Sequence, residues 1–339
     1  MTGREVEVRI VDMKIRIVRA APPKPSGPTV VSGRRFLLVW VGLALSSLCL
    51  GCGPGTPSPS AGGKLQVLAT TGMIADTARQ IAGEHAYVAA LMGPGVDPHL
   101  YQPSTRDQRR LREAQLVFYN GLHLEGKMVE VFESLAKEKS VVAVSADIPE
   151  ERLLSWADAA GMHDPHIWFD VALWKTAAET IVAAFCEADP QHSADYRANG
   201  AKYLIELEKL DQYCRQRVEE IAPDRRVLIT SHDAFHYLGR AYGFEVVGIQ
   251  GISTETEAGL RRLTDTVDLI RARRITAIFP ESSVSRAAIE RVAVDAPVKL
   301  GSELFSDALG AADGPAGTYV GMIRTNIDSI VEALSGESK

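Results

Sequence analysis

The sequence PQHSADYRANGAKYLIELEKLDQYCRQRVEEIAP, residues 190–223, predicts one long helix. Its apolar side chains recur at steps of three and four residues, which places them in one stripe along a helix. About 30 residues at 1.5 Å per residue make a rod of roughly 45 Å. Because this is longer than an ordinary helix of a globular domain, we expect it to run along two structural halves and to brace them. The stripe consists of Leu204, Leu207, Leu210, Cys214, Val218 and Ile221.

Short apolar segments lie on both sides of this helix, four before it and four after it. They are rich in Val, Ile and Leu and alternate with helical patterns, which is typical of buried parallel strands in βα units. The sequence therefore predicts an α/β fold of two pseudo-duplicated domains, each with a mainly four-stranded parallel sheet, joined by one long bridging helix. The cleft between such domains, at the carboxyl ends of their strands, is the expected ligand site. The predicted strands lie within Leu65–Gly72, Ala86–Gly93, Ala114–Gly121, Ser140–Ala146, Arg226–His232, Phe244–Gly251, Ile275–Glu281 and Pro297–Glu303.

The first 51 residues have the pattern of an export signal. A basic stretch leads to Arg34 and Arg35, and an apolar run follows from Phe36 to Leu50. A run of about 15 apolar residues is too short for a membrane span, which needs roughly 20, and suits a secretory signal. The basic stretch is longer than such a signal needs, so we expect translation to start downstream, near Val30 or Val31.

The end of the apolar run predicts a lipoprotein. Gly51-Cys52 is followed by GPGTPSPSAGG, which reads as a lipidation site at Cys52 with a flexible tether behind it. Cys49 stands three residues before Cys52, where lipoproteins usually have Leu, so a plain secreted protein or a membrane-anchored one remains the alternative.

The predicted organisation has five segments. They are an N-terminal extension and signal over 1–51, a tether over 52–64, an α/β domain over 65–190, the bridging helix over 191–222 and a second α/β domain over 223–339. Without residues 1–51 the chain keeps 29 basic and 40 acidic side chains, a net charge of −11. This acidic balance argues against nucleic acid and anionic lipid as partners.

Histidines mark the chemistry of the chain. The tripeptide Asp-Pro-His ends at His99 and again at His166, although the whole chain holds only 8 histidines. In the second half, His232 follows a predicted strand directly, and Asp307 follows the last one. Three imidazoles and one carboxylate, two from each half, make a closed four-ligand site for a transition metal.

Four further carboxyl groups are candidates for supporting these ligands. Asp97, Asp164 and Asp170 are placed to hydrogen-bond the outer ring nitrogens of the ligating histidines. Glu281, at the end of a predicted strand, is expected to face the cleft as well, either in the same role or in a structural one.

Five motifs in order resemble a known family, the substrate-binding proteins of metal-importing ABC transporters, and most closely the TroA-type zinc/manganese-binding lipoproteins. The motifs are DPHLYQPS, NGLHLE, DPHIWFD, TSHDAFHYLGRAYGFEVVGIQG and GSELFSDALG, and the resemblance runs from Leu65 to the C-terminus. It implies a metal between two bridged α/β domains, and a membrane permease with a cytosolic ATPase as partners. Carried over by motif, the family's metal ligands fall on His99, His166, His232 and Asp307.

The identity of the metal stays open among zinc, manganese and ferrous iron. Members dedicated to manganese tend to have Glu at the third ligand position, where this chain has His232. Zinc-dedicated members often carry a His- and Asp-rich loop before the second ligand, and here the segment Ala146–Met162 is short and has no His. Imidazole suits zinc and iron better than manganese, so we expect zinc to bind preferentially in vitro. If Asp307 binds through both oxygens, manganese and iron become easier to accept. Histidines bind metal only when neutral, so affinity should fall as the pH drops through about 6.5.

The sequence favours a carrier over an enzyme. It contains no HExxH, GxSxG, P-loop or GxGxxG motif. A catalytic zinc keeps an open position for water, and four protein ligands leave none. We therefore expect an exported, monomeric receptor, periplasmic or on the cell surface, that passes one divalent metal ion to an ABC importer. The alternatives are a binding protein for a metal chelate or siderophore and, less favoured, a zinc hydrolase.

Overall fold

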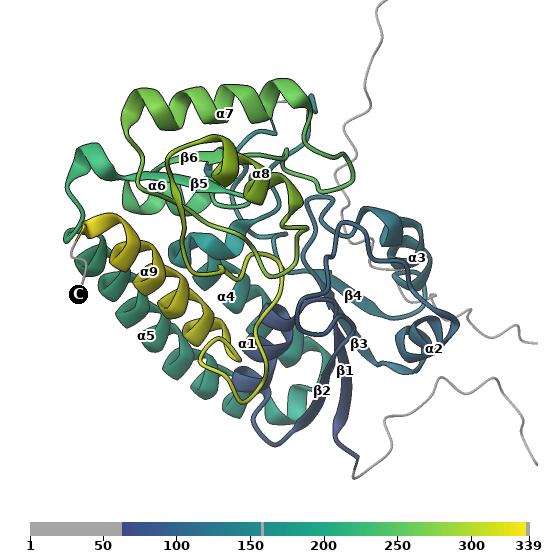
Figure 1. The fold of residues 1–339 in the computed structure, drawn as a ribbon. Helices are drawn as coiled ribbons and strands as arrows, with labels where there is room; N and C mark the ends of the chain where they lie inside the picture. The colour runs from purple at the N-terminus through teal and green to yellow at the C-terminus, as the bar shows by residue number, and fades with distance from the viewer. Residues whose placement is uncertain (1–62, 157–158, 337–339) are drawn as a thin grey trace, which may run out of the picture. The chain divides into compact units, whose positions relative to one another are not determined.

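A computed structural model describes residues 63–156 and 159–336 of the chain (Figure 1). The predicted signal over 1–51, the lipidation site Cys52, the suggested translation start and most of the tether lie outside these described residues. Within them, no helix combines the length and the apolar character that a membrane crossing requires.

The first half is a four-stranded parallel sheet in the order β2-β1-β3-β4. Central strand β1 pairs Leu65 with Ala86 of β2 and Val67 with Leu116 of β3. Because β1 is covered on both faces, its side chains from Val67 to Ala69 are buried. The strands are β1 Leu65–Ala69, β2 Ala86–Ala90, β3 Leu116–Tyr119 and β4 Ser140–Ala143, and the helices of this half are α1 Gly72–Ala82, α2 Thr105–Glu113, α3 Val129–Leu135 and α4 Val171–Ala188, with 3₁₀ turns η1 Gly126–Met128, η2 Glu150–Arg152 and η3 Ile167–Phe169.

The second half repeats this topology. Strand β5 pairs with β6 and β7 pairs with β8, both in parallel, and a single parallel bridge between Thr230 and Phe279 joins the two pairs. The spatial order is therefore β6-β5-β7-β8, which matches β2-β1-β3-β4 strand for strand. The elements are β5 Val227–Thr230, α6 His236–Tyr242, β6 Glu245–Gly248, α7 Leu260–Arg273, β7 Ala277–Ile278, α8 Ala287–Asp295, β8 Lys299–Leu300 and α9 Tyr319–Ser335.

All eight strands occur where the sequence predicts them, but they are shorter, especially in the second half. Strand β7 spans two residues of the expected segment Ile275–Glu281. The residue after Phe279 is Pro280, which has no N–H for the ladder and so interrupts it. The pairing resumes beyond the proline at a bridge between Glu281 and Leu304.

The long helix α5 spans Ser193–Val218, 26 residues, and lies beside α9 in Figure 1. It packs against α1 and α4 of the first half and against α6 and α9 of the second, as expected for a brace. It is shorter than the predicted 191–222. At its N-terminal end, Pro190 begins a separate 3₁₀ turn, η4 Pro190–His192, and at its C-terminal end the helix stops at Val218, ahead of a second 3₁₀ turn, η5 Pro223–Arg225.

The buried stripe of α5 also differs from the prediction at its N-terminal end. Leu204 is only half-buried, and Tyr196, Gly200 and Tyr203 continue the stripe instead. A Cβ atom at Gly200 would lie 2.4 Å from the side chain of Val182 in α4. The glycine therefore lets the two helices approach closely.

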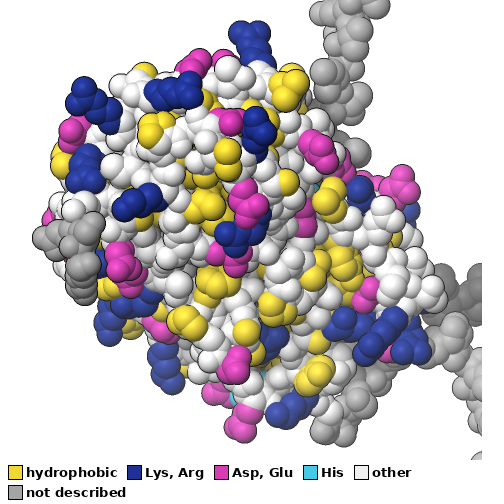
Figure 2. Space-filling view, in the orientation of Figure 1, with side chains coloured by type: hydrophobic (Ala, Val, Ile, Leu, Met, Phe, Trp, Pro, Cys, Tyr) yellow, Lys and Arg dark blue, Asp and Glu magenta, His cyan; other side chains and the backbone are white. Residues whose placement is uncertain are grey.

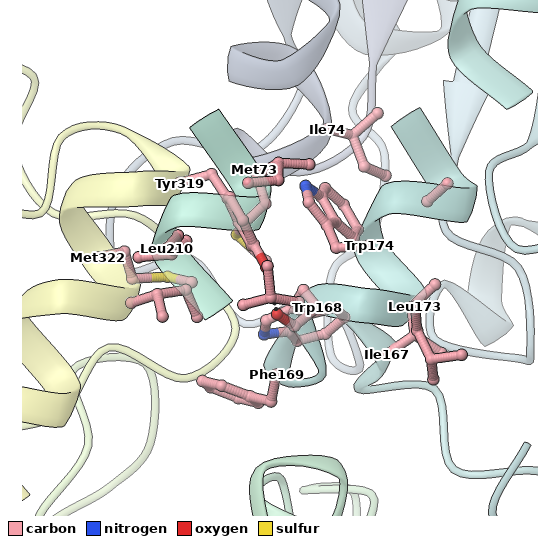
Figure 3. Close-up of a cluster of buried hydrophobic side chains, with 14 of the residues drawn as sticks. Met73, Ile74, Ile167, Trp168, Phe169, Leu173, Trp174, Leu210, Tyr319 and Met322 are labelled. Atoms are coloured by element: carbon pink, nitrogen blue, oxygen red, sulfur yellow. Dashed lines mark hydrogen bonds between the residues drawn. The ribbon is translucent and has the colours of Figure 1, made fainter. Parts of the chain in front are cut away.

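One hydrophobic core runs through both halves (Figure 3). Tyr319 of α9 stacks on Trp174 of α4, with 5.0 Å between ring centroids, and donates a 2.8 Å hydrogen bond to the carbonyl of Trp168. The indole of Trp168 in turn donates to the carbonyl of Ser306 at 2.9 Å. These contacts tie the end of the chain into the first half, and the described residues form one compact unit.

On the face shown in Figure 2, acidic and basic side chains are interspersed and little histidine is visible. Three histidines, His99, His166 and His232, are instead buried, with exposures of 4%, 0% and 0%. A buried imidazole needs a hydrogen-bonding partner, and the partners of these three imidazoles lie in one buried cluster.

Candidate metal centre

Four buried side chains converge at one point between the two halves. They are His99, His166, His232 and Asp307, and one potential ligand atom from each lies within 4.8 Å of the others. His166 is central, because its Nε2 is 3.3 Å from Nε2 of His99, 3.4 Å from Nε2 of His232 and 3.4 Å from Oδ1 of Asp307. These are the four residues that the sequence predicts as metal ligands, and the structure brings them together.

The carboxyl ends of the strands account for this convergence. His99 lies in the loop after β2, and His166 immediately precedes the 3₁₀ turn η3 that leads into α4. His232 lies two residues beyond the end of β5, and Asp307 follows β8. Each half therefore supplies two side chains to the same point, as parallel sheets facing one another require.

The spacing suits a metal ion. Four ligands at 2.0–2.1 Å in a tetrahedron are separated by about 3.3 Å along each edge, which matches the distances around His166. The two oxygens of Asp307 face different imidazoles, since Oδ2 is 3.4 Å from Nε2 of His232. Oδ1 of Asp307 is buried and has no hydrogen-bond donor among the described residues. A cation at the centre would satisfy this oxygen, and the carboxylate is placed to bind through one oxygen or both.

Two of the three imidazoles are oriented by carboxylates behind them. Asp164 Oδ1 accepts hydrogen bonds from the backbone N–H of His166 at 2.9 Å and from its ring Nδ1 at 2.7 Å. Glu281 does the same for His232, with 2.8 Å to the backbone nitrogen and 2.5 Å to Nδ1. A proton held on Nδ1 leaves the lone pair of Nε2 directed at the centre of the cluster.

The other two candidate carboxylates have different contacts. Asp97 Oδ1 accepts the backbone N–H of His99 at 2.8 Å rather than a ring hydrogen bond. Asp170 caps α4, where its Oδ1 accepts from the backbone nitrogens of the first turn, and its Oδ2 pairs with Arg240 at 3.1 Å. Asp170 directly precedes α4, and an N-cap side chain turns back to the helix N–H groups instead of reaching a histidine.

The cluster shifts the pKa values of its own members. Burial lowers the pKa of His99 to about 3. Burial also disfavours the charged form of His166, but the carboxylates of Asp164 and Asp307 outweigh it and raise its pKa to about 10. Burial acts in the opposite direction on Asp307, yet the neighbouring imidazoles hold its pKa well below the usual range. The site therefore keeps an ionised carboxylate at its centre.

Supporting residues that the sequence analysis did not assign lie around the cluster. Asn120 donates a 2.9 Å hydrogen bond to the carbonyl of Pro165 and so holds the loop of His166. The fully buried carboxyl group of Glu125 accepts from Thr70 and from the backbone of Asn120. Thr254 donates to Asp97 from the opposite half. The motif NGLHLE, which contains Asn120 and Glu125, was the only signal in the sequence for any of them.

The nearby His236 does not join the cluster. His236 is the first residue of α6, and its ring Nε2 lies 3.3 Å from Oδ1 of Asp233, although His236 follows His232 by only four residues. Residues 231–235 precede α6, so the helical spacing that would place the two imidazoles on one face does not apply.

Comparison with known proteins identifies the family. Residues 67–333 match the family described as zinc-uptake complex component A, periplasmic. The chain belongs to this family. The relatives described next are named as a manganese-binding lipoprotein, a zinc-binding protein and a substrate-binding lipoprotein of an iron ABC transporter.

Three relatives show how close the similarity is. The manganese-binding lipoprotein MntA of Bacillus subtilis is 45% identical over 84% of this chain and 94% of its own length. The zinc-binding protein TroA of Treponema pallidum is 45% identical over 83% of this chain and 92% of its own length. Its solved structure superposes with a TM-score of 0.78 at 44% identity and covers 80% of this chain and 99% of that one. The iron ABC transporter substrate-binding lipoprotein MtsA of Streptococcus pyogenes is 30% identical over 89% of this chain and 99% of its own length.

The family expectation from the five motifs is thereby confirmed, and so is the expectation of two α/β halves joined by a long helix. The relatives are named for manganese, zinc and iron respectively, and two of them have the same identity to this chain. Overall similarity therefore does not select one metal.

Proposed function

We propose that this chain is an extracytoplasmic receptor that captures one divalent transition-metal ion and delivers it to an ABC importer. The observation that carries the proposal is the convergence of three buried imidazoles and one buried carboxylate within 4.8 Å. In this proposal His99, His166, His232 and Asp307 are the metal ligands, and Asp164 and Glu281 orient two of them.

Zinc is the ion that we expect to bind preferentially in vitro. Three imidazole nitrogens favour zinc or iron over manganese, and the separations of 3.3–3.4 Å between Nε2 of His166 and the other three ligand atoms fit four-coordinate zinc. Because both carboxylate oxygens of Asp307 face the imidazoles, both could bind the ion and raise its coordination number to five, which would accommodate manganese or ferrous iron.

The same coordination supports a carrier that performs no reaction on its cargo. Four protein ligands fill a tetrahedral shell, whereas catalytic zinc keeps a position for water or substrate. All four side chains are at most 4% exposed, which suits a bare ion better than a metal chelate. We therefore favour the naked ion over the siderophore-type ligand and over the hydrolase.

Delivery and anchoring complete the proposal. The relatives named as lipoproteins support a lipid anchor for this chain, which we place on Cys52 with residues 52–64 as the tether. Domains over 65–190 and 223–339, joined by the helix segment 191–222, would then work as a monomer outside the membrane. The partners would be a permease and its cytosolic ATPase. Labelling of the chain with a radioactive fatty acid, and its loss in Cys52→Ser, tests the anchor.

A titration of the metal-free, untagged full chain tests the binding function. Zinc, manganese and ferrous iron are titrated separately in competition with a chelator of known affinity. We expect one ion per chain, with zinc bound most tightly and no turnover of ester or phosphate substrates by the loaded protein. Hydrolysis that depends on the bound metal would instead favour the enzyme, and binding of a chelate but not of free ions would favour the siderophore-type function.

A further inference from the structure

The three imidazoles of the metal centre are not held in the same way. The ring nitrogens of His166 and His232 are each fixed by a carboxylate of the same half of the chain. The carboxylate beside His99, that of Asp97, binds the backbone N–H of His99 at 2.8 Å. His99 is also the most exposed of the three, and its neighbour Leu100 is 46% exposed. The position of His99 therefore depends on the loop that carries it.

That loop is tied to the other half of the chain through Asp97. The second carboxylate oxygen of Asp97, Oδ2, accepts a 2.5 Å hydrogen bond from the hydroxyl of Thr254. Thr254 lies in the segment between β6 and α7, 157 residues away in sequence, and is 9% exposed. A single carboxylate thus connects the backbone of a ligand in the first half to a side chain of the second half.

The segment that carries Thr254 borders a pocket. A cavity of about 350 Å³ is lined by residues of this segment, among them Ile252, Ser253 and Thr256, and by Trp156 from the first half. This pocket opens to the surface, so the segment is not enclosed by protein on that side. A second contact between the halves, the ion pair of Lys127 and Glu255 at 3.5 Å, is largely exposed and contributes little.

We propose that Asp97 and Thr254 are a positioning pair that holds His99 in the metal centre and sets the rate at which the ion leaves. When the hydrogen bond between them breaks, the loop of His99 loses its link to the second half, and His99 becomes the first ligand to withdraw. His166 and His232 keep their own carboxylates and stay in place. This inference rests on the proposed metal-binding function and adds the group that controls release.

The test measures zinc release from the full-length protein by stopped-flow mixing with excess chelator. Thr254→Val removes the hydroxyl at nearly constant volume and should speed release about tenfold or more, as expected for loss of one hydrogen bond to a carboxylate. Thr254→Ser keeps a hydroxyl at this position and should release zinc near the wild-type rate. Lys127→Met, which breaks the exposed ion pair, serves as the matched control and should also remain near the wild-type rate.

Two further measurements separate positioning from a general loss of structure. In the metal-free protein, Thr254→Val should accelerate amide hydrogen exchange in residues 93–101 and leave exchange in α5 unchanged. In a double-mutant cycle, Thr254→Val should add little to Asp97→Ala, because both remove the same link. Release at the wild-type rate from Thr254→Val, or equally fast release from Thr254→Ser, would overturn the inference while leaving the metal site intact. A wild-type chain that binds no zinc would instead refute the proposed function itself.

Discussion

The histidines of the centre depend on the carboxylates behind them. Glu281 is buried and binds both the backbone nitrogen and ring Nδ1 of His232, and Asp164 does so for His166. Each carboxylate fixes the orientation of the ring and makes Nε2 a better donor to a metal. The affinity of the site should therefore also depend on residues that do not touch the ion.

Replacing Glu281 with Gln tests this dependence. The substitution keeps the shape of the side chain but removes the charge that orients His232, so we expect metal affinity to fall about 10- to 100-fold. Glu290→Gln on helix α8, where the side chain is 52% exposed, is the control and should bind like wild type. Chelator-competition titrations measure both. Equal affinities for the two variants would show that Glu281 has only a structural role.

Metal affinity should also rise with pH over a wider range than the sequence alone predicts. Nearby carboxylates raise the pKa of His166, so at neutral pH this imidazole is doubly protonated, and the metal must displace the second proton, the one on Nε2. Each displaced proton makes metal affinity rise by about tenfold per pH unit, until the pH exceeds the pKa that His166 has in the metal-free protein. The gain should therefore continue above pH 7 instead of ending near 6.5.

Calorimetry in buffers of different ionisation enthalpy measures the protons released on zinc binding. We expect net release at pH 7 and about pH 8. Binding without proton release, together with a constant affinity over this range, would contradict a protonated His166 in the metal-free site.

At this scale the sequence located the four candidate ligands and two of their supports, Asp164 and Glu281, but not the remaining contacts around the site. The repeated Asp-Pro-His tripeptide and the strand ends were visible in the chain, so His99, His166, His232 and Asp307 could be chosen together. The contact of Asp97 with Thr254 joins residues 157 positions apart, and no periodicity or motif links them. The sequence predicted that Asp170 contacts a ligating histidine, but its carboxylate instead accepts hydrogen bonds from the first turn of α4.

The element that organises the fold is helix α5. Its buried face contacts helices of both halves, and Leu207 and Leu210 in its middle are completely buried. Its stripe was predictable because steps of three and four survive in the sequence. The role of Gly200 was not, because the need for a small residue arises only when α4 lies against α5.

Leu207→Ala should destabilise the whole protein. Removing a fully buried leucine leaves a cavity and costs about 2–5 kcal/mol of unfolding free energy. Ile205→Ala, on the same helix but 59% exposed, is the matched control and should change stability by less than about 0.5 kcal/mol. Chemical denaturation of both variants compares them. Similar losses for the two positions would mean that the buried face of α5 has been assigned incorrectly.

The strands show what short segments of sequence leave undetermined. The positions of all eight strands follow from apolar runs, but their lengths depend on pairing partners and on single residues such as Pro280. The sheet of the second half is therefore two short pairs joined by one bridge, between Thr230 and Phe279, although the spatial order of its strands repeats that of the first half.

For the molecule as a whole, the continuous core limits how far the two halves can move. Trp168, Trp174 and Tyr319 connect α9 to the first half through stacking and hydrogen bonds, and α5 spans both halves. A wide hinge closure would have to break this core. Release of the ion through movement of the His99 loop needs no such change.

Small-angle scattering should therefore give the same radius of gyration with and without metal. The described part of the chain is expected near 19 Å, from the scaling for compact proteins. Full-length protein is measured metal-free and zinc-loaded at matched concentration, so that residues 1–62 contribute equally to both. A clear contraction on zinc binding would show that the halves close on the ion and would contradict a rigid brace.

The central claim, that the four converging side chains form a metal-binding centre, is tested most directly by counting metal. Untagged, metal-free protein is offered equal limiting amounts of zinc, manganese and ferrous iron, and bound metal is measured by mass spectrometry beside His99→Ala and Asp307→Ala. We predict one ion per chain, mainly zinc, and its loss in both variants. No stoichiometric metal in the wild type, or full binding in both variants, would contradict the assignment of this site.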